Sequence, residues 1–555
     1  MAGANKKFRT GWNAVVFTSL IVLSLVALNL IGTRLFGRVD LTEDRIYTLS
    51  PASKQLVKNL PDRVVAKAFI SKDAPPQLAQ IAKYLRDLLD EYKAASKGKF
   101  TWEAIDPSED PKKEEEASRL GVQKLQIEQL SKEKMSIGST YLGVAFQYGD
   151  KSEKLAQVLK LEGLEYEISS LIKRLAVKKK KIGIVQGQGE PSQQQGLQAM
   201  WGAMGQNYEV VAVTLGATPQ PIPGDVDALL VIGPKQPYSD AAKKAIDDFL
   251  MQGKSVAFLV DGMSLETPRG QMPPEMMGQM PKFARKNEVQ LESLLSAYGF
   301  KIDDDIIMDA QNWPGPVQVG GQWYLANQPY FPVATSMGKH ETTDKLRGLF
   351  FQLASSVDVV GPMKESIEKK GGGAGNLVAL ARSSEKSWKQ TGFFMLDPTH
   401  EIKVGNEMGP FTYGWAYHGP LRSAYGQKAE PPPAAMSTPD QPPSSESKGP
   451  VRLIVIGDSD FVSDDFMRLL QVPRLHQLAM QNGHFFLNII DWLVQDETLT
   501  PIRGKGVTQR PIALKSENAP LLIKAANMVG LPLVFILYGV LRWRRRAAKR
   551  ENFQI

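Results

Sequence analysis

Two short polar clusters hold the residues best suited to binding or catalysis, and each follows a strongly apolar run. The first follows residues 181–186 and consists of Gly187, Gln188, Gly189 and Glu190. The second follows residues 451–456 and consists of Asp458, Ser459 and Asp460. If both runs are strands of one parallel sheet, the clusters lie beyond strand ends, where doubly wound sheets bind ligands. These seven residues are therefore the candidate ligand-binding site.

Ser459 could serve a different chemistry, because a serine directly after a strand is the arrangement of a lipase-like nucleophile. Such a serine needs a histidine base within hydrogen-bond reach. The five histidines are scattered along the chain, at His340, His400, His418, His476 and His484. An esterase using Ser459 stays as an alternative, and the expectation is that the chain is not an enzyme.

Cofactor and metal chemistry has little support in the sequence. The pair Gly187 and Gly189 suits a phosphate cradle, but Ser192 stands where the dinucleotide pattern has its third glycine. The chain has no cysteine, which excludes disulfides and thiolate zinc sites. Asp458, Asp460, Asp464 and Asp465 could hold a hard cation, yet aspartates are equally common as turn and cap residues. No cofactor and no metal are predicted.

The elements around the two clusters follow an alternating pattern that predicts an α/β fold with a doubly wound, flavodoxin-like parallel sheet. The predicted strands are 181–186, 208–215, 228–232, 255–260 and, rejoining the sheet, 451–456. The predicted helices are 193–204, 240–251, 291–298 and 484–494. We assign residues 181–510 to this central domain. Residues 427–450 are rich in Pro and Ser, which predicts a disordered insert.

Residues 40–176 are predicted to form a first αβ domain. Its predicted strands are 63–70, 99–105, 141–148 and 153–158. Its predicted helices are 51–60, 78–92 and 161–175. Ser50 followed by Pro51 suits the start of the first helix, with Ser as the cap and Pro in the first turn.

Both ends of the chain carry long apolar runs. Residues 10–33 contain 24 residues without a charge and residues 525–541 contain 17. About 20 apolar residues of helix cross a bilayer core. We therefore predict transmembrane helices at 10–35 and 519–541.

Cations flank both runs on their terminal sides, in the tails 1–9 and 542–555. Short Lys/Arg-rich flanks stay in the cytoplasm. Both termini are thus expected in the cytoplasm, and the body between them in the periplasm of a bacterial inner membrane.

The net positive charge of the chain comes from those tails. The net charge is +8, but the tails hold 9 of the 67 basic side chains and 1 of the 59 acidic ones, which leaves 58 of each sign. The excess suits contact with anionic membrane lipid rather than a nucleic-acid groove. Nucleic acid is not an expected partner.

The order of several motifs resembles a known family. The motifs are Asp40-Leu41-Thr42-Glu43, Leu164-Glu165-Tyr166, Gly187-Gln188-Gly189-Glu190, Gly457-Asp458-Ser459-Asp460-Phe461 and Asn488-Ile489-Ile490-Asp491-Trp492-Leu493. Together with the two terminal runs, this series resembles the GldG-type auxiliary subunits of bacterial ABC transporters, named after a gliding-motility protein. The resemblance covers essentially the whole chain.

The resemblance implies a non-catalytic exported subunit that accompanies an ABC-2-type permease with six membrane spans and a separate cytoplasmic ATPase. It also implies a central domain like that of intraflagellar-transport proteins and glutamine amidotransferases. The cysteine of those amidotransferases has no counterpart here, and Gln188 stands where family members usually carry His.

Three functions therefore remain open. The first is the auxiliary transporter subunit. The second is a module that binds an envelope glycan or a lipid-linked sugar at the two polar clusters. The third is the esterase at Ser459.

Overall fold

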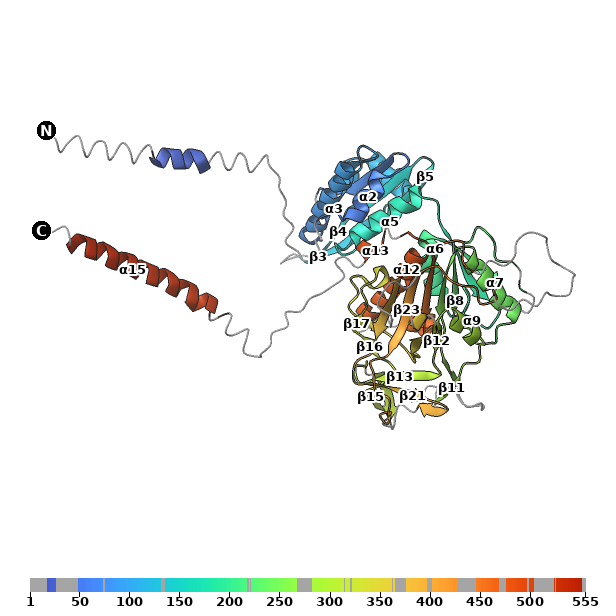
Figure 1. Cartoon of the computed structure of the whole chain (residues 1–555). Coiled ribbons are helices and arrows are strands. Elements are labelled where there is room, and N and C mark those ends of the chain that lie inside the picture. Colours follow the sequence, from blue (N-terminus) through green and yellow to red (C-terminus); the bar gives the residue numbers. More distant parts are fainter. Residues whose placement is uncertain are drawn as a thin grey trace, which may run out of the picture. The chain divides into compact units, whose positions relative to one another are not determined.

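A computed structural model describes most of the folded body (Figure 1). The described residues are 17–25, 48–72, 75–130, 135–216, 219, 221–266, 282–313, 315–319, 322–361, 363–364, 376–396, 402–426, 446–468, 476–496, 499–503, 524 and 526–551. Within them, two lobes can be distinguished by their separate sheets and cores. We call residues 48–176 the amino-terminal lobe and residues 181–503 the central lobe.

The amino-terminal lobe is built on a five-stranded sheet in the order β2-β1-β4-β3, with β5 also pairing with β4. Only β1 and β2 are parallel. The strands are β1 (Val64–Ile70), β2 (Phe100–Ile105), β3 (Lys124–Leu130), β4 (Met135–Tyr148) and β5 (Lys151–Leu155). The helices are α2 (Pro51–Lys58), α3 (Pro76–Ala95), η1 (Pro107–Glu109), α4 (Pro111–Arg119) and α5 (Leu164–Ala176).

Strand alternation explains which helices cover which face of this sheet. Alternate residues of a strand point to opposite faces. Val64, Ala66 and Ala68 belong to the core that contains the buried side chains of α2, α3 and α5. Phe69 belongs to a smaller core with Ala117 of α4. The predicted helix start at Ser50 is confirmed, because its hydroxyl accepts a hydrogen bond from the backbone N–H of Ser53.

The central lobe contains an eight-stranded sheet in the order β17-β20-β23-β24-β9-β8-β6-β7. Its five parallel strands are β6 (Lys181–Gln186), β7 (Glu209–Thr214), β8 (Ala228–Ile232), β9 (Ser255–Leu259) and β24 (Val451–Ile456). Numbered along the chain, they lie in the order 2-1-3-4-5, which is a doubly wound arrangement. The predicted return of residues 451–456 to the sheet is confirmed.

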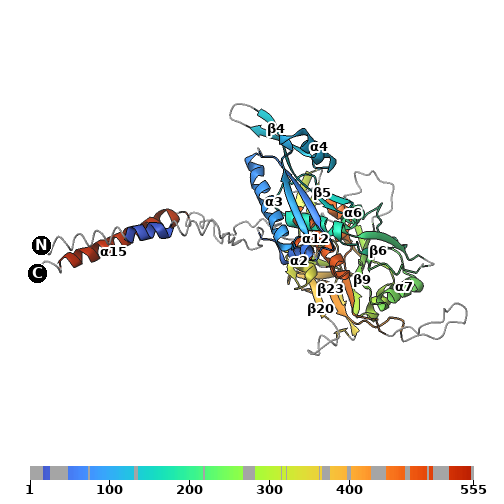
Figure 2. The ribbon, with the colours of Figure 1, turned by 90° about the horizontal axis from the view of Figure 1, so that it is seen from above.

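Helices cover both faces of the parallel strands (Figure 2). One face packs against α6 (Gln198–Asn207) and α12 (His476–Leu493), and the other against α7 (Asp240–Met251) and α9 (Glu292–Ala297). Strands buried on both faces read as continuous apolar runs. That property made β6, β8 and β24 recognisable from the sequence with their observed boundaries.

Apart from β13, which lies within residues 302–309 that the sequence indicates as extended chain, the remaining strands of the central lobe were not predicted. Three antiparallel strands extend the large sheet: β17 (Ser336–Met337), β20 (Asn376–Arg382) and β23 (Thr412–Gly419). Small sheets join β10 (Met263–Glu266), β11 (Lys282–Lys286) and β22 (Phe394–Leu396); β12 (Phe300–Ile302) and β19 (Val357–Val359); β13 (Asp305–Asp309) and β21 (Ser387–Thr391); β14 (Gly315–Val319) and β15 (Gln322–Ala326); and β16 (Val333–Ala334) and β18 (Leu349–Phe350). Short helices are η2 (Glu341–Thr343), η3 (Asp460–Val462), α11 (Asp464–Met467) and α13 (Thr500–Arg503).

Two predicted helix boundaries were wrong. The helix expected at 193–204 begins at Gln198, because Ser192 and Gln195 close a turn through mutual backbone hydrogen bonds. The helix expected at 484–494 begins at His476. Most of the predicted insert 427–450 lies outside the described residues, so its disorder stays a prediction.

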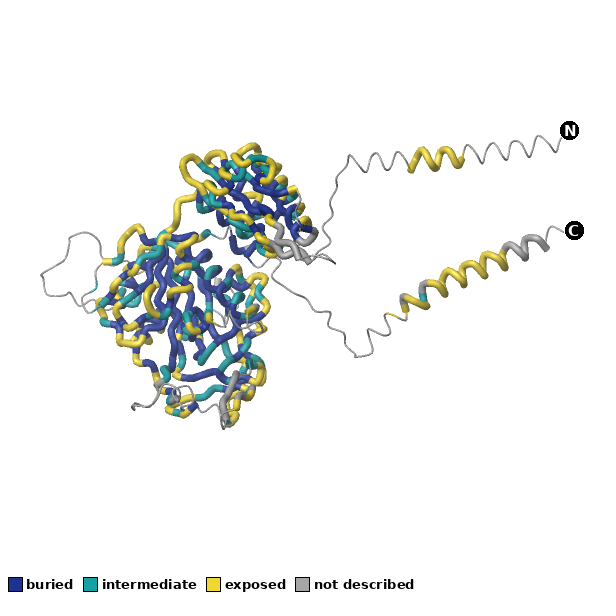
Figure 3. Tube along the Cα trace, turned by 180° about the vertical axis from the view of Figure 1, so that it is seen from behind, coloured by how far each residue is buried: buried dark blue, intermediate teal, exposed yellow. Residues whose placement is uncertain are grey.

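The predicted membrane spans are only partly described. Residues 17–25 of the first are helical, and its other residues lie outside the described part of the chain. Over the second, a π-helical turn (Ala526–Gly530) leads into α15 (Leu531–Glu551). Large apolar side chains on both segments are exposed, including Leu23 and Phe535. Figure 3 shows both segments coloured as exposed along most of their described length. Within the described residues, no helix has both the length and the apolar composition that a membrane span requires.

Candidate functional site

The structure brings the two predicted polar clusters to one edge of the central sheet. The loop after β6 and the loop after β24 both contact the loop that follows β8. A Cβ added at Gly233 would lie 2.7 Å from Ser459 Oγ and 3.5 Å from Pro191 Cδ. Gly233 has φ +56°, a left-handed conformation that favours glycine. A glycine at this position thus permits the close approach of the two loops.

An unpredicted carboxylate, Asp261 at the end of β9, joins the two clusters. Its Oδ1 accepts a hydrogen bond from the backbone N–H of Ser459 at 2.7 Å, and its Oδ2 accepts one from the Ser459 hydroxyl at 2.8 Å. Lys235 Nζ lies 2.8 Å from the same Oδ2. The backbone N–H of Lys235 in turn donates to the carbonyl of Gln188 at 2.8 Å. A chain of hydrogen bonds therefore runs from the first cluster to the second.

The first cluster is held by hydrogen bonds within the protein. Gly187 and Gly189 have φ values of +124° and +75°, which turn the chain sharply after β6. Glu190 is buried, and its two oxygens accept hydrogen bonds at 2.6 Å from the Gln188 N–H and from the Tyr238 hydroxyl. Burial and the Glu190 carboxylate hold the pKa of Tyr238 well above its ordinary value. Tyr238 therefore remains a hydrogen-bond donor to Glu190.

The polar atoms of the second cluster likewise form hydrogen bonds within the protein. Asp458 is fully buried, and its carboxylate accepts hydrogen bonds from the backbone N–H groups of Gln352 at 2.8 Å and Asp460 at 2.6 Å. Burial, followed by the charges of Asp460 and Asp261, raises the pKa of Asp458 well above its ordinary value. This aspartate organises the turn after β24.

Asp464 and Asp465, which were also considered as cation ligands, have partners within the protein as well. Asp464 caps α6, because its two oxygens accept hydrogen bonds of 2.8 Å from the backbone N–H groups of Gln198 and Ala199. Asp465 forms an exposed ion pair with Arg468 at 3.0 Å. The structure does not bring these carboxylates together on one centre. No group of three or more His, Cys, Asp or Glu side chains within the described residues could hold a metal ion.

Within the described residues, no histidine pairs with Ser459 as a serine hydrolase requires. Its hydroxyl donates to Asp261 rather than to a histidine, and the residue is buried. His340 packs against Trp492 of α12, and His484 lies on α12 itself. His400 lies outside the described residues. A small cavity beside Asp261 measures about 30 Å³. That volume is of the order of one water molecule.

A second candidate region, which the sequence did not indicate, lies where the two lobes meet. We call it the seam: α5 of the amino-terminal lobe together with α12, α13 and the residues they contact in the central lobe. At its amino-terminal side, Glu165 of α5 is buried. Its Oε1 accepts hydrogen bonds from the Ser50 N–H at 2.8 Å and the Ser53 hydroxyl at 2.7 Å. The point where the chain enters the body is thus fixed to α5.

The last described segment of the central lobe is held by Tyr166, the residue that follows Glu165 in α5. Arg503, the last residue of α13, has a side chain that is 1% exposed. Its Nε donates to the Tyr166 hydroxyl at 3.3 Å, and its other nitrogens donate to Asp491 at 2.7 Å and to the amide oxygen of Asn488. Burial alone would lower the pKa of Arg503, but Asp491 more than offsets this, so it stays charged.

Other seam contacts surround Asp491. The Tyr208 hydroxyl and the Thr500 hydroxyl also donate to its carboxylate. Burial and the Asp491 charge hold the pKa of Tyr208 well above its ordinary value. Lys173 of α5 lies 2.8 Å from Asp496 and 5.7 Å from the centre of the Tyr208 ring. The ion pair of Lys173 with Asp496, its contact with the Tyr208 ring and the hydrogen bond from Arg503 to Tyr166 therefore cross between the lobes.

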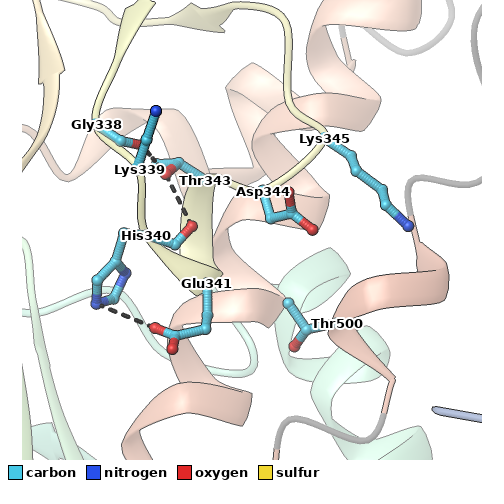
Figure 4. A pocket seen from close by; sticks show the side chains of 8 residues that line it. All are labelled: Gly338, Lys339, His340, Glu341, Thr343, Asp344, Lys345 and Thr500. Atoms are coloured by element: carbon cyan, nitrogen blue, oxygen red, sulfur yellow. Dashed lines mark hydrogen bonds and ion pairs between the residues drawn. The ribbon is translucent and has the colours of Figure 1, made fainter. Parts of the chain in front are cut away.

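A pocket of about 610 Å³ lies beside α13 (Figure 4). Thr500 lines one side, and the segment around η2 lines the rest: Gly338, Lys339, His340, Glu341, Thr343, Asp344 and Lys345. The Asn488 side-chain amide donates to the carbonyl of Thr342, also in η2, at 3.1 Å. The pocket wall and Arg503 therefore share Asn488 as a neighbour.

Comparisons with known proteins identify a transport family. The amino-terminal part, residues 43–147, matches a domain of unknown function. An uncharacterized protein of Borreliella burgdorferi is 23% identical over 525 residues, covering 92% of this chain and 93% of that protein. A solved structure titled mmIFT52 N-terminal domain is similar at 10% identity with a TM-score of 0.32, covering 56% of this chain and 96% of that one.

The central lobe carries the decisive match. Residues 179–493 match the family described as ABC-type uncharacterized transport system, an auxiliary family. The match spans more than half of the chain and includes both polar clusters; of the seam helices it includes α12 but neither α5 nor α13. The chain belongs to this ABC transport auxiliary family.

Proposed function

We propose that this chain is a non-catalytic, GldG-type auxiliary subunit of an ABC-2-type transporter. Its two ends anchor it in the bacterial inner membrane, both termini are cytoplasmic, and its lobes lie in the periplasm. There it engages a six-span permease, which works with a separate cytoplasmic ATPase, together with a substrate or envelope partner.

The observation that carries this proposal is that the first and last described segments of the two lobes meet at α5. Glu165 binds the entry segment at Ser50 and Ser53, and Tyr166 binds the exit residue Arg503. The helix α13 contacts both α2 and α5. Terminal segments that leave a folded body from neighbouring points suit a body held by both ends at one surface.

Two further features support membrane attachment. Exposed apolar surface on a soluble protein commonly marks a membrane or protein contact. Such surface is concentrated on residues 17–25 and on α15, where Phe535 and Ile536 are both more than half exposed. The basic side chains that follow, among them Arg544 and Arg545, are those expected on a cytoplasmic flank.

Copurification tests the proposal. A tagged chain is extracted from its native membrane in mild detergent, and the recovered proteins are identified by mass spectrometry. We expect a permease with six spans and an ATPase in near-equal amounts with the bait. A matched control bait in which residues 526–541 are replaced by an unrelated membrane span separates specific pairing from general membrane recovery. Recovery of the native chain without either protein would contradict the proposal.

The glycan-binding alternative is tested at the two polar clusters. Calorimetry of the purified protein with envelope glycans compares the native chain with the double variant Glu190→Ala and Asp458→Ala. Binding that is lost only in the double variant would favour a ligand site at this edge of the sheet. Because Asp458 and Glu190 already hold backbone and side-chain donors, we expect the double variant to lose stability rather than affinity.

A further inference from the structure

Arg503 has an unusual position for a charged residue: it is buried between two lobes, at the end of the last described element of the central lobe. Burying a guanidinium is favourable only where acceptors surround it. Asp491 and Asn488 supply acceptors from the central lobe, and Tyr166 supplies one from the amino-terminal lobe. The planar fork of arginine can meet all three at once.

We propose that α13 is a latch that holds the two lobes together while Arg503 is seated. Displacement of the C-terminal segment withdraws Arg503 and lets the amino-terminal lobe move against the central lobe. The proposal rests on the proposed function for the source of that displacement, namely a moving permease. The latch itself rests on the contacts of the seam.

The contacts of Asp491 make the latch a two-state element. With Arg503 seated, the Asp491 carboxylate has a full set of donors, which includes Tyr208 and Thr500. Withdrawal of Arg503 leaves a buried carboxylate without its cation, so a half-seated arrangement is unfavourable. Tyr208, which would have to readjust, also lies under Lys173 of the amino-terminal lobe. Loss of one contact therefore weakens the next.

The first and last segments of the described body have different effects on the seam when they are displaced. The entry segment is bound by Glu165, which lies in the same lobe as Ser50 and Ser53. Displacing that end moves the amino-terminal lobe as a whole. The exit helix α13 belongs to the central lobe but holds Tyr166 of the other lobe. Displacement of the carboxyl-terminal end therefore acts directly on the seam.

The absence of native cysteines gives a direct test in the full-length chain, reconstituted in lipid nanodiscs. Spin labels are attached at Lys83→Cys on α3 and Ala241→Cys on α7, both exposed positions on different lobes. Distances between the labels are measured by double electron–electron resonance. We expect a single narrow distribution in the otherwise native chain. Arg503→Ala should raise the population at longer distances at least tenfold.

Further variants keep the test informative if Arg503→Ala folds poorly. Tyr166→Phe removes one hydrogen bond across the seam without unpairing Asp491, and should give a smaller shift in the same direction. Lys389→Ala is the matched control, because Lys389 is a largely buried cation that pairs with Asp303 at 3.1 Å and Asp305 at 3.3 Å within the central lobe, outside the seam. Its distance distribution should match that of the parent.

Two outcomes would overturn the latch. One is an unchanged narrow distribution in both Arg503→Ala and Tyr166→Phe while circular dichroism shows native folding. The other is an equal broadening in Lys389→Ala, which would show general loosening of the central lobe.

The source of displacement is tested separately, in nanodiscs that also hold the copurified permease and ATPase. ATP should lengthen the distances, and an unchanged distribution there would overturn the actuation step. Failure to recover a permease or ATPase at all would instead count against the proposed function and leave the label distances of the isolated chain as the test of the latch.

Discussion

The hydroxyl of Ser459 already has a partner, since it donates to Asp261 at 2.8 Å. We predict that Ser459→Ala lowers the free energy of unfolding by about 1 kcal/mol, because a buried carboxylate oxygen loses one of its donors. Lys235 still pairs with that oxygen, which limits the loss. Urea unfolding followed by circular dichroism measures the difference.

An assay of ester hydrolysis on the same Ser459→Ala variant supplies the opposing outcome. If the native protein hydrolyses a model ester and the variant does not, at equal stability, the esterase reading would be favoured over the structural one.

His484 of α12 gives a prediction about pH. Burial, followed by the charge of Arg503, lowers the pKa of His484 to about 4. Because the unfolded chain binds this proton near its ordinary pKa of about 6.5, the unfolded state gains protons first as the pH falls. The stabilisation is therefore complete above about pH 6.5 and is lost as the pH falls toward 4, by up to about 3 kcal/mol.

The variant His484→Gln should flatten that part of the stability profile, measured as the urea midpoint between pH 4 and 7. His476→Gln is the matched control, because His476 lies on the same helix but is exposed. Parallel profiles for the native chain and His484→Gln would contradict the assignment.

Which site residues could be predicted depended on their distance along the chain. Gln188, Glu190 and Asp458 follow recognisable apolar strands, so their place at the sheet edge followed from the fold. Asp261 directly follows the predicted strand 255–260, but its pairing with Ser459 joins residues 198 positions apart. This pairing follows from the order of the parallel strands in the sheet, and the strand order cannot be read from a single sequence.

At the scale of elements, the most direct test is a substitution in α5, because this helix binds both the first and the last segment of the described body. Glu165→Ala removes the acceptor for the Ser50 N–H and the Ser53 hydroxyl. We predict a loss of about 2–3 kcal/mol in the free energy of unfolding, because buried donors lose their partner. Glu165→Gln is the matched control, since it keeps one acceptor oxygen in nearly the same shape and should lose less.

Proteolysis can locate the effect of Glu165→Ala within the chain. Limited digestion should cut the variant near the entry segment before the central lobe is cut. Equal stability of the two Glu165 variants would contradict a role for its carboxylate in fixing that segment.

Elements with a strong repeating signal were predicted well, and short ones were not. The stripe of α3 and the apolar runs of β6, β8 and β24 identify elements that are buried by a regular pattern. Between residues 310 and 426 the strands are two to eight residues long and pair antiparallel, either in small sheets or as an extension of the large sheet. Such strands are specified by their partners rather than by local sequence. The antiparallel extension β17-β20-β23 belongs to this class.

At the scale of the whole molecule, the family match and the seam lead to one prediction about topology. The chain has no native cysteine, so a single introduced cysteine can be labelled without background. We expect Lys83→Cys on the amino-terminal lobe to react with a membrane-impermeant maleimide in intact spheroplasts. Arg545→Cys on α15 should react only after the membrane is permeabilised, because its basic neighbours favour the cytoplasm.

The two positions are matched for this comparison, because both are exposed in the folded protein and differ in the side of the membrane on which they are expected. A cysteine at Ala241 provides the same test for the central lobe. Labelling of Arg545→Cys in intact spheroplasts would place the tail outside and remove the two-anchor topology. Protection of both lobe positions in intact cells would place the body in the cytoplasm, and the seam would then need a different source of displacement.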